Sequence, residues 1–533
     1  MPLPSSIALC GLALALPFVA GATLPVPQAN NKRAECFTST QTQQQLASVL
    51  SKKATILGPA DADWVDATER YMQQIQPTVC LSVRPGTEDD VAKIVRFANE
   101  LGVPFYTVSR GHALTTSVGR FQGIEIDLRD LNAFEVNPNN ATARFQGGAF
   151  SHEVIVGLWE QGFVTGNIPA PSEREALSDW GLGPTGTGGC ECVSVIGPAL
   201  GGGHGLQQGQ HGLTMDMLVN LNVVLANGTA VQVNETSHPD LWWAMRGAGH
   251  NFGIVTSYES QVFPEDKSKT YLVKTYQFAG RSLEAVIDRI NKFQGLGTLD
   301  PTWLGSFGLY TMNTTLSKTE AIINWAFVYS GLEADGHAAL KPFDDIGPLS
   351  VDVANVPYSV VNGYIGGGMD GWLCEGNKTH VIGTSNLQTY NKTAMRSIYD
   401  LYNQKIRQHP RLGHTRVLVE GYSVKGVLSR RSEDSAYPLR DEHILTYFDT
   451  RFDSTDDPLI PFARKWRDQT VALWYGGQPA RRPTTYVNYA AGYESLEARY
   501  GYEPWRLEKL RKLKRQYDPE NKFSWYNPIF PPA

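Results

Sequence analysis

The most informative stretch of this chain is Cys190-Glu-Cys-Val-Ser-Val-Ile-Gly-Pro-Ala-Leu-Gly-Gly-Gly-His-Gly205. Two thiols precede the glycines Gly201, Gly202 and Gly203, and the segment between them is mostly apolar. Because glycine lacks a Cβ, its backbone can approach a large flat ligand closely and aim N–H groups at phosphate oxygens. A thiol beside such a loop can anchor that ligand covalently. The alternative is a tight buried turn whose cysteines form a disulfide or stay idle in the core.

The overall composition is that of a globular protein. The 533 residues are enough for two or more domains with sizeable cores. Hydrophobic residues make up 42% and charged residues 19%, which are ordinary values. The net charge of −6 and the pI near 6.0 argue against a nucleic-acid partner, since phosphate binding needs clustered Lys and Arg.

The N-terminus is typical of a secreted protein. Residues 1–22 contain an apolar run that ends in Ala20-Gly21-Ala22, which predicts a signal peptide. Residues 23–33 end in the dibasic pair Lys32-Arg33 and predict a propeptide. No other apolar run is long enough to span a bilayer, so we expect no membrane partner. The six N-x-S/T sequons agree with secretion and predict glycosylation at Asn140, Asn227, Asn234, Asn313, Asn377 and Asn391.

The cysteine count is odd after signal removal. Cys10 leaves with the signal, and the cysteines that remain are Cys36, Cys80, Cys190, Cys192 and Cys374. In an oxidising compartment, at least one of them must be free or bonded to something other than a cysteine of this chain.

Local patterns predict mixed helices and strands in two regions. From about Cys80 to Pro264 the elements include helices after Thr87 and over 151–160, and a hairpin over 218–233 with a type I′ turn at Asn227-Gly228. From about 266, longer helices (282–293, 392–408) alternate with aromatic strands, which predicts a second domain. A final helix covers 503–517. Residues 167–185 form a polar, unpatterned stretch whose G-x-G-x-x-G match lacks the strand and helix that give this motif meaning. We expect this stretch to be an unspliced intron or an atypical loop.

Four segments carry a shared pattern: Arg84-Pro-Gly-Thr87 with Thr107 to Leu114, the Cys190 to Gly205 loop, Trp243 to Thr256, and Tyr486-Val-Asn-Tyr489 with the helix to Asn521. In this order they resemble the flavoprotein oxidases with a vanillyl-alcohol-oxidase or PCMH-type FAD domain, and in particular the secreted branch of berberine bridge enzyme and the oligosaccharide oxidases. The resemblance implies an α+β fold, with a two-part PCMH-type FAD-binding domain and an inserted α/β substrate domain built on an antiparallel sheet. It assigns 34–265 and 471–533 to the FAD domain and 266–470 to the substrate domain.

The same resemblance implies a covalently held FAD. His112 would bond to the flavin, although Ser109-Arg110-Gly111-His112 has Arg where the family has glycine; the alternative is a polar turn residue. Cys190, rather than Cys192, matches the family's second tether. Cys36 and Cys80 would form a disulfide, while Cys192 and Cys374 are either paired or both free. The implied cofactor-binding residues are His112, Cys190, Arg110, Gly111, Gly201, Gly202, Gly203, Gly253, Ile254, Val255 and Asn488.

The resemblance also implies an oxidase. A small alcohol, sugar or secondary metabolite would give a hydride to the flavin, and dioxygen would take the electrons to form hydrogen peroxide. Tyr489 is the candidate active-site phenol, or alternatively a buried aromatic residue with a satisfied hydroxyl. Berberine bridge enzyme has a glutamate base on the strand after a Phe-Pro-His-Arg motif, but here Phe448 falls nearest that place, with Asp449 next to it, and the strand 444–448 has no carboxylate. No base is identified, which leaves open a non-catalytic flavin or ligand carrier on the same scaffold. No H-E-x-x-H or comparable spacing predicts a metal site.

Overall fold

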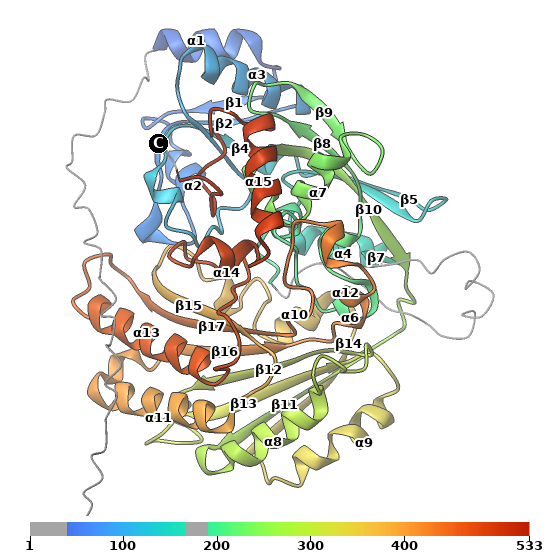
Figure 1. The fold of residues 1–533 in the computed structure, drawn as a ribbon, viewed down its shortest axis with the longest axis vertical. Helices are drawn as coiled ribbons and strands as arrows, with labels where there is room; N and C mark the ends of the chain where they lie inside the picture. Colours follow the sequence, from blue (N-terminus) through green and yellow to red (C-terminus); the bar gives the residue numbers. More distant parts are fainter. Residues whose placement is uncertain (1–39, 166–189, 532–533) are drawn as a thin grey trace, which may run out of the picture. The chain divides into compact units, whose positions relative to one another are not determined.

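The computed structural model of the chain describes residues 40–165 and 190–531 (Figure 1). The predicted signal peptide, the propeptide, Cys36 and the stretch 167–185 lie outside these residues. The structure is a mixture of helices and mainly antiparallel sheets, which confirms the predicted fold class. Among the residues described, none of the helices combines the length and the apolar character needed to cross a membrane.

The first sheet along the described chain is small and has four strands. The order is β1-β2-β4-β3, and β2, β4 and β3 are parallel. The Thr87 side chain accepts a hydrogen bond from the Asp90 backbone and Asp90 reciprocates, which is the predicted capping box. One face of the helix that follows packs Val91, Ile94 and Val95 against this sheet. The elements are α1 (Thr40–Val49), β1 (Thr55–Leu57), α2 (Trp64–Thr68), β2 (Thr78–Arg84), α3 (Glu88–Glu100), β3 (Phe105–Val108) and β4 (Gln122–Asp127).

A second, six-stranded sheet continues the same region. Its order is β5-β6-β10-β8-β9, and β7 pairs with the far end of β10. The strands are β5 (Phe134–Asn137), β6 (Thr142–Gln146), β7 (Phe163–Thr165), β8 (Leu218–Val224), β9 (Ala230–Val233) and β10 (Ile254–Pro264). The helices among them are α4 (Ser151–Glu160), α5 (Ile196–Ala199), α6 (Gln208–His211) and α7 (Pro239–Ala248).

The hairpin between β8 and β9 forms where it was predicted, but its turn is not of type I′. A type I′ turn requires a positive φ at both central residues. Here Gly228 has a φ of +80°, whereas Asn227 is not in the left-handed region. The Gly228 N–H donates to the Leu225 carbonyl, and the Leu225 N–H donates to the Thr229 carbonyl. The turn is therefore one residue longer than predicted, with glycine in the left-handed position, and Asn227 is still exposed at its tip.

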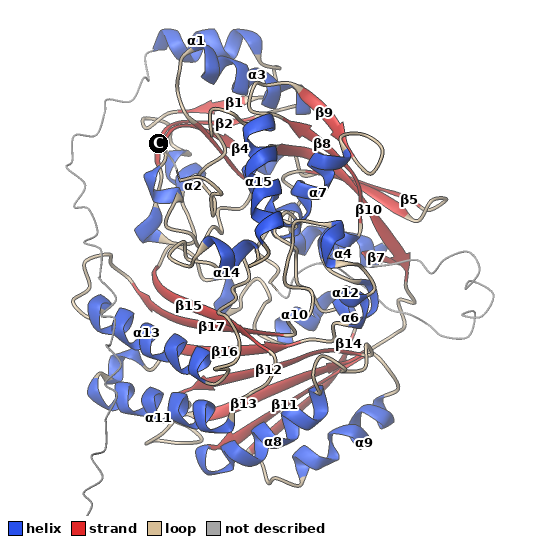
Figure 2. Cartoon of the chain, in the orientation of Figure 1, coloured by secondary structure: helices blue, strands red, loops and turns tan. Residues whose placement is uncertain are grey.

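A seven-stranded antiparallel sheet is built from the middle of the chain, in the order β14-β11-β13-β12-β16-β17-β15 (Figure 2). The strands are β11 (Tyr271–Ala279), β12 (Trp303–Thr311), β13 (Ile322–Tyr329), β14 (Ser350–Val356), β15 (Thr379–Leu387), β16 (Arg416–Gly421) and β17 (Ile444–Phe452). The helices are α8 (Leu283–Gln294), α9 (Glu333–Asp344), α10 (Val361–Tyr364), α11 (Lys392–Gln408), α12 (Lys425–Leu428), α13 (Ile460–Gly476), α14 (Leu496–Tyr500) and α15 (Pro504–Tyr517).

The two faces of this sheet contact different surroundings, because side chains alternate between the faces along each strand. On one face, residues such as Val417, Val419 and Phe448 share a core with α8, α9, α11 and α13. On the other face, residues such as Leu418 and Glu420 line a cavity. Phe448, which the resemblance put nearest the missing glutamate, therefore points into the helix-side core.

A buried ion pair joins the second sheet's region to the segment before β17. Arg440 donates to both carboxylate oxygens of Asp216, at 2.8 and 3.0 Å, and the two side chains are 3% and 1% exposed. Removing one partner of such a pair leaves an uncompensated buried charge.

We therefore expect Asp216→Ala to lower the free energy of unfolding by about 3–5 kcal/mol. Denaturant unfolding followed by tryptophan fluorescence measures the loss. The matched control is Lys341→Met, which breaks the exposed Lys341–Asp345 pair and should cost about 1 kcal/mol or less. Equal losses in the two variants would show that the Asp216–Arg440 pair contributes no more to stability than an exposed ion pair.

Candidate functional site

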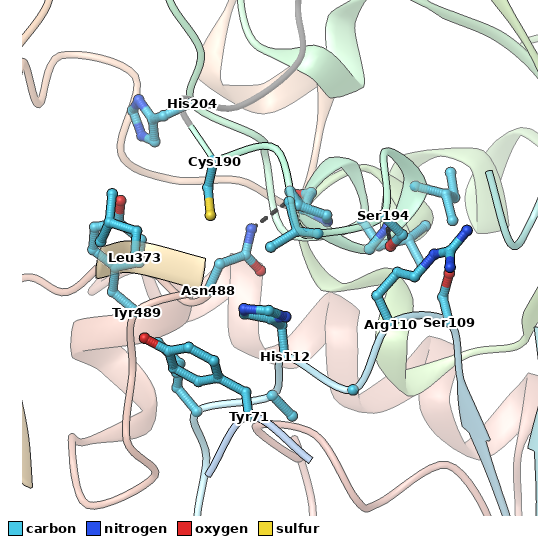
Figure 3. Close-up of a pocket in the computed structure, with 18 of the residues that line it drawn as sticks. Tyr71, Ser109, Arg110, His112, Cys190, Ser194, His204, Leu373, Asn488 and Tyr489 are labelled. Atoms are coloured by element: carbon cyan, nitrogen blue, oxygen red, sulfur yellow. Dashed lines mark hydrogen bonds between the residues drawn. The ribbon is translucent and has the colours of Figure 1, made fainter. Parts of the chain in front are cut away.

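A cavity of about 470 Å³ lies where the three sheets' loops and strand faces meet (Figure 3). One part of its wall comes from the loop after β3, the segment around α5 and the start of β10. The other part is the inner face of the seven-stranded sheet. Most of the predicted cofactor-binding residues line it, namely Arg110, Gly111, His112, Cys190, Gly253, Ile254, Val255 and Asn488, and Tyr489 does as well.

The glycines Gly201, Gly202 and Gly203 are not part of the cavity lining. Gly202 and Gly203 have φ values of +114° and +82°, which side-chain-bearing residues rarely adopt. A Cβ at Gly202 would lie 2.8 Å from the Tyr437 ring, and one at Gly203 would lie 2.6 Å from Thr214. These glycines let the loop pack tightly against Tyr437 and Thr214.

His112 stands in the cavity wall as a neutral imidazole. Its ring stacks on Tyr71 at a centroid distance of 4.2 Å, and Tyr71 in turn stacks on His380 at 4.5 Å. Burial lowers the pKa of His112 to about 4. The ring therefore carries no proton on one of its nitrogens at neutral pH and can act as a nucleophile.

Three sulfur atoms cluster beside His112. Cys192 and Cys374 form a disulfide, which settles the alternative left open by the sequence, and Cys190 is a free thiol. The Cys190 sulfur lies 3.1 Å from that of Cys192, and the Cys192 sulfur lies 3.6 Å from His112 Nε2. Burial raises the pKa of the Cys190 thiol to about 12. The sulfurs are close enough for a soft metal ion, but the disulfide uses two of them. Cys80 is also disulfide-bonded.

A buried carboxylate that sequence reasoning missed faces the same cavity. Glu420 on β16 accepts a hydrogen bond from the Tyr489 hydroxyl at 2.9 Å and another from the Tyr422 hydroxyl at 2.7 Å. Burial raises the pKa of Glu420, and the two hydrogen bonds oppose that rise. Burial, and then the charge of Glu420, raise the pKa of Tyr489 well above its ordinary value. The phenol therefore keeps its proton at neutral pH and donates it in a hydrogen bond to the carboxylate.

A signal for Glu420 exists in the sequence. Arg416-Val-Leu-Val-Glu-Gly421 is a short apolar strand with one carboxylate in it, and a charge on a buried strand is a candidate functional group. The register of the sheet places Glu420 between two other strands, because it is paired with Leu445 on β17 and with Phe307 on β12. Asp449, the other nearby carboxylate, is bound instead to His380 at 2.9 Å and to Arg451 at 2.8 Å.

Asn488 links the phenol's segment to the cysteine loop. Its amide donates to the Pro198 carbonyl at 2.9 Å and to the Tyr486 hydroxyl at 2.7 Å. The Tyr486 hydroxyl also accepts from the backbone N–H of Gly203 at 3.1 Å. Asn488 thus fixes the position of Tyr489 relative to the loop that carries Cys190.

The residues present fit a covalently held flavin. A neutral imidazole and a free thiol are side chains that can form covalent bonds to an electron-poor ring, and both line one cavity together with residues from three loops.

Comparisons with known proteins relate the chain to FAD-binding proteins. Residues 81–175 match the model of an FAD binding domain. The FAD-linked oxidoreductase anuG of Penicillium roqueforti is 44% identical over 489 residues, which cover 92% of each chain. Two solved structures share the fold at 20% identity and a TM-score of 0.73. One is the BBE-like 1 protein of Physcomitrella patens, over 93% of this chain and 99% of that one. The other is glucooligosaccharide oxidase from Acremonium strictum, described with a 6-S-cysteinyl, 8α-N1-histidyl FAD, over 92% and 99%.

Proposed function

Since this chain belongs to the family of FAD-linked oxidoreductases, we propose that it is an oxidase of a small, largely apolar alcohol or related secondary metabolite, with its flavin held by His112 and Cys190. The observation that carries the proposal is the hydrogen bond from Tyr489 to Glu420 inside the cavity. Bound there, the flavin would accept a hydride from substrate and pass the electrons to dioxygen, giving hydrogen peroxide.

The proton moves through Tyr489. A substrate hydroxyl that approaches the phenol gives its proton to the Tyr489 oxygen as the Tyr489 proton passes to Glu420. Tyr422 holds the other carboxylate oxygen, so Glu420 keeps its orientation throughout. Removal of this proton places negative charge on the substrate oxygen, which favours loss of the hydride from the adjacent carbon. Glu420 offers a base that the sequence did not identify, whereas Asp449 on β17 is bound to His380 and Arg451, and this favours an oxidase over a carrier.

The lining of the cavity favours an apolar substrate. Many of the side chains that line the cavity together with Tyr489 are aromatic or aliphatic, and they include Phe307, Leu309, Ile365, Trp372, Leu373, Leu418 and Tyr447. A sugar buried among them would leave hydroxyl groups without partners, and each such loss costs about 1–3 kcal/mol. An apolar ring or chain with one oxidisable carbon loses nothing of this kind.

We expect peroxide release from benzylic and long-chain alcohols to exceed that from xylo- or cello-oligosaccharides by about tenfold or more in kcat/KM. A peroxidase-coupled assay over a panel of both classes measures it. Peroxide release from the oligosaccharides alone would contradict the apolar substrate class.

The oxidase is distinguished from a carrier by colour. We expect an active substrate to bleach the yellow protein without oxygen, and air to restore the colour. A protein that stays yellow with every compound of the panel, in the presence and absence of oxygen, would be a carrier.

Secretion remains part of the proposal. Four of the sequon asparagines, Asn140, Asn227, Asn377 and Asn391, are exposed, whereas Asn234 and Asn313 are partly buried. Asn234 also donates its amide to Asn220, an interaction that a glycan on the same nitrogen would hinder. Recovery of the protein from culture medium, with a mass that falls on enzymatic deglycosylation, would support secretion.

A further inference from the structure

The disulfide Cys192–Cys374 occupies an unusual position for a structural bond, because it lies beside a free thiol in the wall of the cavity. Cys190 is 3.1 Å from the Cys192 sulfur and 3.7 Å from the Cys374 sulfur. Sulfur atoms at these distances need little movement to bond. Without the existing pairing, Cys190 would have two thiols within reach.

We propose that the Cys192–Cys374 disulfide protects Cys190, so that Cys190 alone remains a thiol and is available for attachment to the flavin. This inference rests on the proposed attachment through Cys190. Three thiols in one cluster allow three pairings, and two of these consume Cys190. Each pairing in the secretory pathway would pass two electrons and two protons from two thiols to a disulfide-bonded oxidant, which becomes a dithiol. Only the pairing seen here leaves Cys190 free.

The backbone selects this pairing. Glu191, between the two cysteines, donates its N–H to the Gly367 carbonyl at 2.8 Å. Its carboxylate is held by His152 at 2.9 Å. Further along the same segment, the Cys374 N–H donates to the Gly371 carbonyl. The segment that carries Cys374 is thus fixed against Glu191, with Cys192 buried toward it and Cys190 partly open to the cavity.

The attachment that the disulfide protects is the formation of a bond between the Cys190 sulfur and the flavin ring. The Cys190 sulfur loses its proton and forms a bond to a flavin ring carbon, and that carbon loses its hydrogen as a proton. The electron pair from the broken C–H bond stays in the ring until dioxygen takes it and becomes hydrogen peroxide. A Cys190 already in a disulfide has no sulfur lone pair available as a thiolate and cannot start this reaction.

The test compares two single variants with the double variant. In Cys374→Ser and in Cys192→Ser, the remaining thiol pairs with Cys190, and we expect the yield of the flavin–Cys190 peptide to fall by about tenfold or more. In Cys192→Ser/Cys374→Ser, no partner is left, and the yield should return to that of the wild type. Mass spectrometry of non-reduced digests measures the flavin peptides and the new disulfide, with flavin on His112 as the internal reference.

Three results would overturn or limit the protective role of the disulfide. A single variant with a full yield would overturn the protective role, and so would a double variant with a low yield. Wild-type protein with flavin on His112 alone would overturn this inference while leaving the oxidase function in place. Should the double variant fail to fold, Cys374→Ser produced under reducing conditions gives the same comparison, because Cys190 then cannot pair and its flavin peptide should return.

Discussion

Glu420→Gln is expected to slow flavin reduction by substrate by about 10²–10⁴-fold, the range for loss of a positioned general base. Glutamine keeps the size of the side chain and can still accept a hydrogen bond from Tyr489. It cannot take the proton that the phenol must release. Since the pKa of Tyr489 lies well above its ordinary value, the phenol is no substitute base.

Anaerobic stopped-flow measurement of flavin bleaching gives the rate. The control is Glu442→Gln, which changes another buried glutamate with a raised pKa that lies outside the cavity lining. It should leave the reduction rate of the folded protein unchanged. A Glu420→Gln protein that is reduced at the wild-type rate would show that Glu420 is not the base.

The pH profile gives an independent check. Burial raises the pKa of Glu420, so the carboxylate becomes protonated at a higher pH than an exposed glutamate. The protonated form cannot accept a proton, and the reduction rate should therefore fall as the pH decreases through this raised pKa. In Glu420→Gln this acid limb should disappear. An acid limb that persists in the variant would belong to another group.

The second large effect concerns the flavin itself. We expect His112→Ala/Cys190→Ser to lose all covalent flavin, while each single variant keeps its flavin through the remaining bond. The physical reason is that a single covalent bond is enough to survive denaturation, whereas non-covalent contacts vanish with the fold. The protein is precipitated with acid, and the pellet and supernatant are examined for colour.

The wild type should give a yellow pellet and the double variant a white pellet under a yellow supernatant. His337→Ala, a substitution of a partly exposed histidine outside the cavity lining, serves as the control and should behave like the wild type. A white pellet from the wild type would refute attachment, and a yellow pellet from the double variant would assign the bond to another residue.

Local features of the fold could be predicted from the sequence. The helices 151–160 and 392–408 were predicted to the residue, because their apolar spacing is a local signal. The turn at Asn227-Gly228 was misjudged since both turn types place glycine in a left-handed position, and only the pairing of the flanking strands decides how many residues the turn contains.

The site was predictable only in part. His112, Cys190 and Tyr489 belong to motifs and were found by resemblance. Glu420 lies 69 positions before Tyr489, and their contact depends on the register of strands that no short pattern encodes. The bond between Cys192 and Cys374 spans 182 positions and likewise arises only when two distant loops fold together.

The alternation of side chains along β12, β13 and β16 has a consequence for evolution. Leu309, Asn324 and Leu418 face the cavity, while their immediate neighbours Tyr310, Ile323 and Val419 hold the helices on the opposite side. A substitution at Leu309, Asn324 or Leu418 can change the shape of the cavity without disturbing the packing that keeps the sheet folded. Duplicated genes of this family can therefore diverge in substrate preference one strand position at a time, and the scaffold tolerates each step.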